Sequence, residues 1–462
     1  MSLDLERPLR NPDASSPPLM TKRARWLVLW GFVLPGSAQV LAGNRKLGRF
    51  GLGATLVLLA LAFVGVIGML FAQETTLSIV TNSIFLLVLQ GVIFAYAVLW
   101  LVLGFDTLRL TRLVSVTPNW RVPVAMLAVV LTVLPVGAAA WAGLTVGAAR
   151  GAIGDIFGGG APAVEAIDGR YNFVMLGVDA GADREGLRPD SISVISVDAK
   201  TGQSVIIGLP RYLENMPFPE TSPMHELHPG GFGLDWGCNV GDCYLNAVYA
   251  EVEYFAPELY PDAASRGSSP GIQATVDAAS GATGLDIQFY VMVDMSGFSS
   301  IIDALGGVDI TVRESLPIGG QIDEWTGELV NVEGWIEPGQ QHMDGYTAEW
   351  YARSRLGSAL GDYDRMERQR ELQAAILAQM NPANVLLRFQ EVAKTGSSVV
   401  QTDIPESMLG RFVDLATKAK NHPPVTVELV PPAVDPEFPD YTVIHQLVAE
   451  GVAAASPPPE EQ

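Results

Sequence analysis

Five arginines lie within eighteen residues of one another, in a part of the chain that is otherwise rich in acidic residues. On a helix, Arg365, Arg368 and Gln369 would share one face with apolar residues that follow, so this stripe is expected to face a core. A buried guanidinium is costly unless an anion meets it, and both an internal carboxylate and a phosphate ligand fit that need. Arg is well suited to phosphate because its planar fork binds two oxygens at once. The five residues are Arg353, Arg355, Arg365, Arg368 and Arg370.

A second charged group follows the first strand expected in this region. The segment GVDAGADREGLRPDS contains Asp179, Arg184, Arg188 and Asp190. Another arginine, Arg211, follows a later strand in the segment GLPRY. Residues that leave the carboxyl end of a strand often face a ligand crevice. Carboxylate oxygens suit Mg²⁺ or Mn²⁺ while arginines suit phosphates, so a metal–phosphate site is one interpretation. An ordinary turn with surface salt bridges is the other.

Other catalytic patterns are absent from the sequence. The chain has no GxxxxGK[ST], HExxH or GxSxG motif, and its five histidines are scattered. Its only cysteines, Cys238 and Cys243, exclude a four-cysteine zinc site. Because they are close together in a segment interpreted as exported, a small disulfide is favoured over two free thiols.

The charge of the chain is distributed unevenly. The whole chain of 462 residues has a formal net charge of -21, made up of a net of +6 in residues 1–149 and a net of −27 in the rest. A polyanion-binding protein needs a surplus of positive charge, so a nucleic-acid partner is excluded for the acidic part.

The pattern beyond residue 166 predicts a mixed α/β domain. Short β-branched or apolar runs predict strands, and amphipathic segments between and after them predict helices. The strands are expected at 172–178, 191–197, 204–209, 289–293, 308–312 and 425–430. The helices are expected at 271–282, 298–305, 347–355, 365–380, 383–394, 405–418 and 442–453.

The amino-terminal third predicts a membrane region. Three uncharged stretches, at about 50–73, 77–105 and 122–149, are each long enough to cross a hydrocarbon core of about 30 Å. A fourth, 26–43, is short and contains Pro and Gly, so a re-entrant or short helix is favoured over a fourth span. Loops on the cytoplasmic side of a membrane carry an excess of Lys and Arg. With three spans, the basic residues that flank these stretches are all cytoplasmic, which places residues 1–25 in the cytoplasm and everything after 149 outside. A Gly-rich linker is expected at 150–165, a catalytic domain at 166–453 and a disordered tail at 454–462.

The charged motifs occur in the order found in a known family. They are NFVMLGVDAGADREGLRPDS, GLPR, DALGGVDITV, and GQQHMDGYTAEWYARSR followed by GDYDRMERQR. With these motifs the chain resembles the LytR-CpsA-Psr family of cell-envelope glycopolymer ligases, over roughly Tyr171–Met380.

The resemblance implies an exported α/β/α sandwich around a mixed sheet. It also implies a polyprenyl (pyro)phosphate ligand, with the lipid tail in an apolar tunnel and the phosphates held by arginines. The implied phosphate-binding residues are Arg188, Arg211, Arg353, Arg355, Arg365 and Gln369. The implied metal and catalytic carboxylates are Asp179, Asp190 and Asp362.

Two positions depart from the family pattern. Tyr212 stands where the family often has Asp or Asn, and Tyr244 where it often has Lys. One positive charge of the family site is therefore expected to be missing here.

The function predicted from the sequence is a membrane-anchored phosphotransferase. It would move a glycan from a polyprenyl-pyrophosphate lipid to a peptidoglycan hydroxyl, with Arg188 and Arg365 and a divalent metal neutralising charge on the phosphoryl oxygens. Asp190 or Asp362 would position or deprotonate the hydroxyl. The alternatives are a lipid pyrophosphate hydrolase and a non-catalytic lipid or glycan carrier. A carrier needs arginines but not three carboxylates together, so the carboxylate set favours an enzyme.

Overall fold

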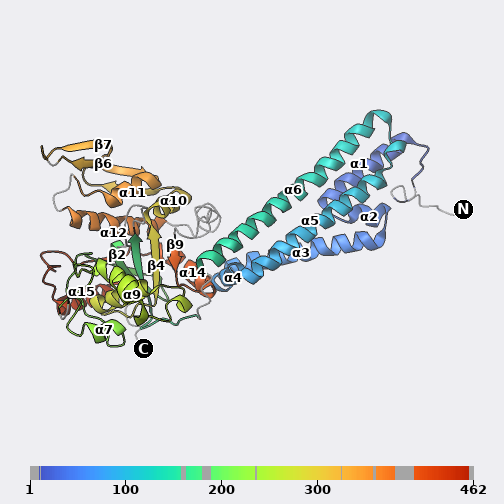
Figure 1. The fold of residues 1–462 in the computed structure, drawn as a ribbon. Helices are drawn as coiled ribbons and strands as arrows, with labels where there is room; N and C mark the ends of the chain where they lie inside the picture. The colour runs from blue at the N-terminus through green and yellow to red at the C-terminus, as the bar shows by residue number, and fades with distance from the viewer. Residues whose placement is uncertain are drawn as a thin grey trace. The chain divides into compact units, whose positions relative to one another are not determined.

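The computed structural model describes residues 10, 12–157, 163–178, 189–234, 237–323, 325–356, 361–379 and 400–456. The chain forms two compact units, Met1–Gly151 and Ala152–Gln462, whose elements are labelled in Figure 1. Of the expected features, Asp179, Arg184, Arg188 and the helix at 383–394 lie outside the described residues.

The first unit is helical. Its described residues contain three helices that are long and apolar enough to cross a membrane: Arg45–Phe71, Ser83–Ser115 and Pro118–Phe157. Most of their apolar side chains are exposed, as expected for surfaces that face lipid. The helices are α1 (Pro17–Val33), α2 (Ser37–Ala42), α3 (Arg45–Phe71), α4 (Gln73–Val80), α5 (Ser83–Thr111) and α6 (Pro118–Phe157).

Two details at the ends of this unit bear on the sequence predictions. The segment 26–43 is not one helix, because the chain turns at Gly36 between α1 and α2. Gly36 has φ of +96°, a conformation that glycine adopts readily. It also lies so close to α3 that a Cβ would be 2.5 Å from the Gly48 carbonyl oxygen. The linker predicted to begin at residue 150 is wrong over 150–157, where α6 continues. The glycines of this segment do not prevent a helix, because an isolated glycine costs only about 1 kcal/mol of helix stability. Burial of Ala152 and Ile153 favours the helical conformation there.

The second unit contains a mixed six-stranded sheet. Its strand order is β10-β3-β2-β1-β4-β9. β1 pairs antiparallel with β2 and parallel with β4, and β10 pairs parallel with β3. The strands are β1 (Arg170–Val178), β2 (Pro189–Asp198), β3 (Ser204–Leu209), β4 (Phe289–Asp294), β9 (Val400–Thr402) and β10 (Val425–Glu428).

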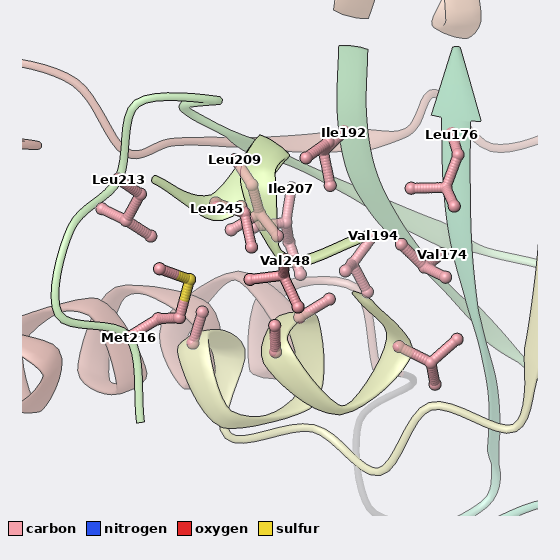
Figure 2. Close-up of a cluster of buried hydrophobic side chains, with 14 of the residues drawn as sticks. Val174, Leu176, Ile192, Val194, Ile207, Leu209, Leu213, Met216, Leu245 and Val248 are labelled. Carbon is pink, nitrogen blue, oxygen red and sulfur yellow. The ribbon is translucent and has the colours of Figure 1, made fainter. Parts of the chain in front are cut away.

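One face of this sheet packs into the main core. Alternate residues such as Val174, Leu176 and Val194 are buried against Val248 and its neighbours, as Figure 2 shows. The covering helices are α8 (Val248–Phe255), α9 (Pro270–Thr283) and α15 (Tyr441–Ala454). Successive side chains of a strand point to opposite faces of the sheet, so apolar residues at every second position place their side chains in this core.

The opposite face lies against a second set of helices. These are α10 (Met295–Leu305), α12 (Asp362–Gln379) and α14 (Leu409–Ala419), which line a cavity together with the sheet. Helices on both faces of a mixed sheet make an α/β/α sandwich, so the predicted fold class is confirmed.

Two smaller sheets flank α11 (Gly345–Arg353). β5 (Val308–Val312) pairs with β8 (Gly339–Met343), and β6 (Leu316–Ile322) pairs with β7 (Leu329–Ile336) as a hairpin. Their buried residues form a separate core with α11 and α12, which includes Ile310, Leu316 and Tyr351. Of these strands, only β5 was expected from the sequence.

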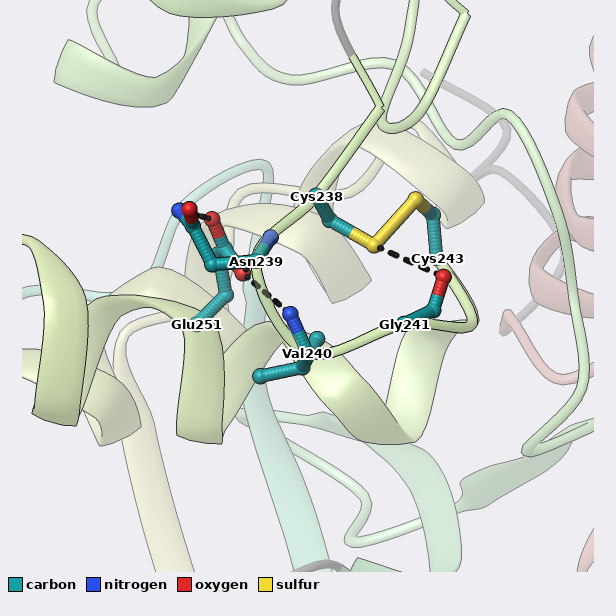
Figure 3. Close-up of a disulfide and its surroundings, with 6 residues drawn as sticks. All are labelled: Cys238, Asn239, Val240, Gly241, Cys243 and Glu251. Carbon is teal, nitrogen blue, oxygen red and sulfur yellow. Dashed lines mark hydrogen bonds between the residues drawn. A yellow bond between two sulfur atoms is a disulfide. The ribbon is translucent and has the colours of Figure 1, made fainter.

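The predicted disulfide is present in the structure. Cys238 and Cys243 are bonded, with Cα atoms 5.7 Å apart (Figure 3). The buried Glu251 carboxylate accepts hydrogen bonds from the Asn239 and Val240 backbone amides at 2.8 and 3.2 Å. The disulfide closes the loop, and the Glu251 carboxylate holds the loop against α8.

Candidate active site

The register of two antiparallel strands brings the first charged pair together. Ile192 of β2 lies opposite Leu209 of β3. Two residues before Ile192 is Asp190, and two residues after Leu209 is Arg211, so both side chains leave the same edge of the sheet. Arg211 Nη1 forms an ion pair with Asp190 Oδ1.

Arg211 has one donor that no described residue satisfies. Its side chain is only 10% exposed, and its Nε is buried without a hydrogen-bond acceptor. The Asp362 Oδ2 lies 3.8 Å away, beyond hydrogen-bonding distance. A buried N–H without an acceptor costs about 1–3 kcal/mol, so this atom is suited to an anionic ligand.

The first turn of α12 supplies a carboxylate and a second buried arginine. Arg365 Nε donates to Asp362 Oδ1 at 3.0 Å, and its Nη1 donates to the Asp190 backbone carbonyl at 2.9 Å. The Arg365 side chain is 4% exposed. The pKa of Arg365 is lowered by burial, and the Asp362 charge offsets only part of that shift.

The segment after α11 adds a third cation. Arg355 Nε lies 3.3 Å from Asp362 Oδ1, and its Nη2 lies 3.9 Å from Asp190 Oδ1. Its side chain is 45% exposed, so it borders solvent. Among the described residues, three guanidiniums therefore share two carboxylates, and the group has one positive charge in excess.

The structure places the other predicted residues differently. Arg353 pairs with Glu349 at 2.8 Å, and its guanidinium lies over the Trp350 ring. Gln369 donates its side-chain amide to the Ala352 carbonyl at 3.1 Å and also lines the cavity. Asp179 and Arg188 lie outside the described residues, so their predicted roles remain predictions.

The other two arginines of the sequence cluster have structural partners. Arg368 donates to the backbone carbonyls of Tyr351 and Ser354, and Arg370 pairs with Glu428 at 3.0 Å. The expectation that an anion meets each buried guanidinium is therefore confirmed for both. The closest acceptors of Arg368 are carbonyl oxygens at the end of α11, and its Nη1 also lies 3.9 Å from Glu314 Oε1. These bonds hold the segment that carries Arg355.

Two tyrosines were not predicted as site residues: Tyr212, which borders the Arg211 side chain, and Tyr244, which packs against Tyr212. The Arg211 guanidinium lies 4.3 Å from the centre of the Tyr212 ring and also contacts its hydroxyl. Tyr212 and Tyr244 form an edge-to-face pair with centroids 5.4 Å apart. Both had been singled out in the sequence, but only the fold shows that they are neighbours.

An apolar cavity of about 400 Å³ adjoins the charged group. It lies between the sheet and helices α10, α12 and α14, and side chains such as Phe173, Ile206 and Ile376 line it. A smaller chamber lined by Asp190, Arg211 and Arg365 is adjacent, and the two spaces share lining residues: Ser191, Gln369 and Gln373. The site thus combines cations with an adjoining apolar space, which suits an anion attached to a hydrocarbon chain.

The carboxylates are compatible with a divalent cation. Asp190 and Asp362 supply hard oxygen donors, and no cluster of three acidic, His or Cys residues is present in the described part of the chain. Mg²⁺ is usually bound through one or two carboxylates together with water and substrate phosphate. The two described carboxylates therefore fit this metal without a third.

A family model matches most of the second unit. The LytR_cpsA_psr family model covers residues 160–435. This chain belongs to the LytR_cpsA_psr family. The match includes every residue of the site described above, from Asp190 to Gln369.

Two of the curated relatives that are similar to this chain have names that refer to the cell wall or its peptidoglycan. The polyisoprenyl-teichoic acid–peptidoglycan teichoic acid transferase TagV of Bacillus subtilis is 28% identical over 137 residues, which are 30% of this chain and 34% of TagV. The cell wall biosynthesis protein LcpA of Corynebacterium glutamicum is 23% identical over 318 residues, which are 64% of this chain and 58% of LcpA. The chain thus spans less than two thirds of either relative.

Among solved structures, the crystal structure of TagV from Bacillus subtilis is similar to this LytR_cpsA_psr chain. The TM-score is 0.41 with 19% identity, over 62% of this chain and 97% of the TagV chain.

Proposed function

We propose that the second unit transfers a glycopolymer from a polyprenyl-pyrophosphate lipid to a peptidoglycan hydroxyl, leaving a phosphodiester link. The observation that carries this proposal is the cationic group that adjoins the apolar cavity. The arginines match the phosphates of such a lipid, and the cavity matches its hydrocarbon tail. The family membership and the transferase named among the relatives support the same reaction.

The chemical step is a phosphoryl transfer. The acceptor hydroxyl oxygen attacks the glycan-side phosphorus and forms a new P–O bond, while the bond from that phosphorus to the bridging oxygen breaks. Polyprenyl phosphate leaves with the bridging oxygen, and the hydroxyl proton passes to Asp190 or Asp362. Arg211, Arg355 and Arg365 neutralise the charge on the phosphoryl oxygens, which is usually the largest contribution to such catalysis.

A bound Mg²⁺ or Mn²⁺ would add further charge neutralisation at the pyrophosphate. Asp190 and Asp362 are the described residues that would hold it, and Asp179 is the sequence-based candidate for a third ligand. The arginines retain their roles of binding and orienting the phosphates.

The topology proposed from the sequence places this chemistry outside the cell. The three apolar helices anchor the chain as a multi-pass protein, and the basic flanks favour a cytoplasmic amino terminus. Peptidoglycan hydroxyls lie outside the membrane, and the pyrophosphate supplies the free energy for transfer without ATP. A phosphatase reporter fused after residue 160 should be active, and one fused near Arg112 should be silent.

Lipid-phosphate binding tests the proposed site. Arg211→Ala in the full chain should weaken binding of polyprenyl phosphate by about 10-fold or more, because a buried phosphate contact is lost. The matched control is Arg313→Ala, since Arg313 is 67% exposed and pairs with Glu367 and Glu371 away from the site. Equal affinities of the two variants would contradict the proposed site.

A further inference from the structure

A row of aromatic side chains runs along α11 toward the arginine site. Tyr346 and Trp350 lie one helical turn apart, with ring centroids 6.5 Å from each other in an edge-to-face arrangement. The Arg353 guanidinium lies 5.7 Å from the centre of the Trp350 ring. Arg355, two residues further on, pairs with Asp362, so the row leads directly into the charged group.

The hairpin extends this row at its other end. The Tyr346 hydroxyl donates to Glu333 Oε2 of β7 at 2.9 Å. Glu333 and Trp335 of that strand are both exposed, and the pairing of β7 with β6 shifts register beside Glu333. Trp335 is 50% exposed and Tyr346 is 48% exposed. Two large rings thus remain open to solvent on adjoining elements.

The chemistry of the row fits a carbohydrate. The C–H faces of sugar rings pack on aromatic rings, and carboxylates such as Glu333 and Glu349 accept hydrogen bonds from sugar hydroxyls. The sequence of the hairpin from 316 to 336 contains four acidic residues and no Lys or Arg. A phosphate-rich polymer or an anionic membrane would therefore be repelled here, whereas a glycan backbone would not.

We infer that Trp335, Tyr346 and Trp350 form an acceptor subsite that binds the glycan backbone of peptidoglycan. The glycan chain lies along the three aromatic side chains and places a sugar hydroxyl next to the phosphate held beside Arg355. This inference rests on the proposed function, because it assigns the acceptor of that same transfer. The continuity from Trp350 through Arg353 to Arg355 is the observation that links the subsite to the chemistry.

Glycan binding by the full chain tests the inference. The probe is a neutral β-1,4-linked oligomer of N-acetylglucosamine, which presents the uncharged sugar backbone, titrated into the detergent-solubilised protein while intrinsic Trp fluorescence is recorded. Trp335→Ala and Tyr346→Ala should each weaken binding by about 10-fold, and Tyr346→Phe should recover most of the affinity because it keeps the ring. Polyprenyl phosphate binding should be unchanged in all three variants.

The matched control is Trp325→Ala on the same hairpin. Trp325 is 96% exposed in the turn before β7, and the first residue of β7, Leu329, already lies about 20 Å from Trp335 at 3.4 Å per residue. Trp325→Ala should therefore leave glycan binding unchanged. Undetectable glycan binding by wild-type protein that still binds polyprenyl phosphate would overturn the subsite and leave the proposed function standing. Loss of glycan binding in Trp325→Ala but not in Trp335→Ala would also overturn it. Failure to bind polyprenyl phosphate would instead contradict the proposed function.

Discussion

Arg365 joins two segments that are 175 residues apart in the chain by donating its Nη1 to the Asp190 backbone carbonyl at 2.9 Å. The same guanidinium binds the Asp362 carboxylate through Nε and Nη2. One buried side chain therefore sets the distance between the start of β2 and the first turn of α12. These are the two elements that carry the site carboxylates.

Arg365→Lys should separate these two elements. An ammonium group cannot make the three directed contacts of the guanidinium, so turnover should fall by about 100-fold. The measurement is the release of polyprenyl phosphate from a lipid-linked glycan. Arg313→Lys, at an exposed arginine that pairs with two glutamates, is the control and should retain wild-type turnover. Retained turnover in Arg365→Lys would contradict this prediction, because it would show that a positive charge at this position supports turnover without the directed contacts of the guanidinium.

Asp362→Asn should have opposite effects on binding and on turnover. Removal of this carboxylate raises the positive excess of the described group by one charge, so phosphate binding in EDTA should tighten by about 1 kcal/mol. Turnover with Mg²⁺ should fall, because a proposed proton acceptor and metal ligand is lost. Titration with polyprenyl phosphate, with and without the metal, measures both. Weaker binding in EDTA would contradict the electrostatic description of the site.

Ala416→Trp should fill the apolar cavity. Ala416 of α14 is among the residues that line it, and the indole would occupy space assigned to the lipid tail. Binding of a long-chain polyprenyl phosphate should weaken by about 10-fold, as expected from the apolar contact that is lost, while a short-chain analogue should bind as before. Lys418→Trp on the same helix, which does not line the cavity, is the control. Equal loss for long and short chains would place the tail elsewhere.

Asp403 should make the stability of the second unit depend on pH. Its carboxylate accepts the Tyr290 backbone N–H at 2.8 Å, and burial raises its pKa to about 6 from the ordinary value of 3.8. Between these values the folded state keeps a proton that the unfolded state has released. Stability should therefore fall as the pH rises from about 4 to about 6 and then level off, by up to about 3 kcal/mol.

Asp403→Asn removes this titration while keeping an acceptor for the Tyr290 amide. The melting temperature of the variant should be nearly constant from pH 4 to pH 7 apart from the background of other groups, and higher than that of wild type at pH 7. A wild-type melting temperature that rises through this range in parallel with that of the variant would contradict the assigned pKa.

The sequence was sufficient to predict the elements with strong periodicity. The alternation in β1, β2 and β3 gave their positions closely, and the stripe on α12 correctly predicted that Arg365 is buried. The β6–β7 hairpin was missed because its strands contain Pro317, Gly319 and Gly320 and its register shifts between Ile318 and Gly319, so its alternation is weak.

The partners of the arginines could not be derived from spacing. Arg365 and Arg368 lie on the same stripe of α12, yet one binds carboxylate and the other binds backbone carbonyls. The difference depends on where α11 ends, which is a tertiary property. The pairing of Asp190 with Arg211 depends likewise on the register of β2 and β3, which the sequence of either strand alone does not fix.

The fate of the glycan-side phosphorus tests the central claim most directly. Purified full-length protein would be incubated with a lipid-linked glycan that carries radioactive phosphorus at the glycan-side position, together with peptidoglycan. The account predicts that the label becomes covalently attached to peptidoglycan in equal amount to the polyprenyl phosphate released, and that Arg211→Ala abolishes both. Label that accumulates on free glycan at the same rate with or without peptidoglycan would identify a hydrolase. Label that stays on the lipid would identify a carrier, and either result would contradict transfer.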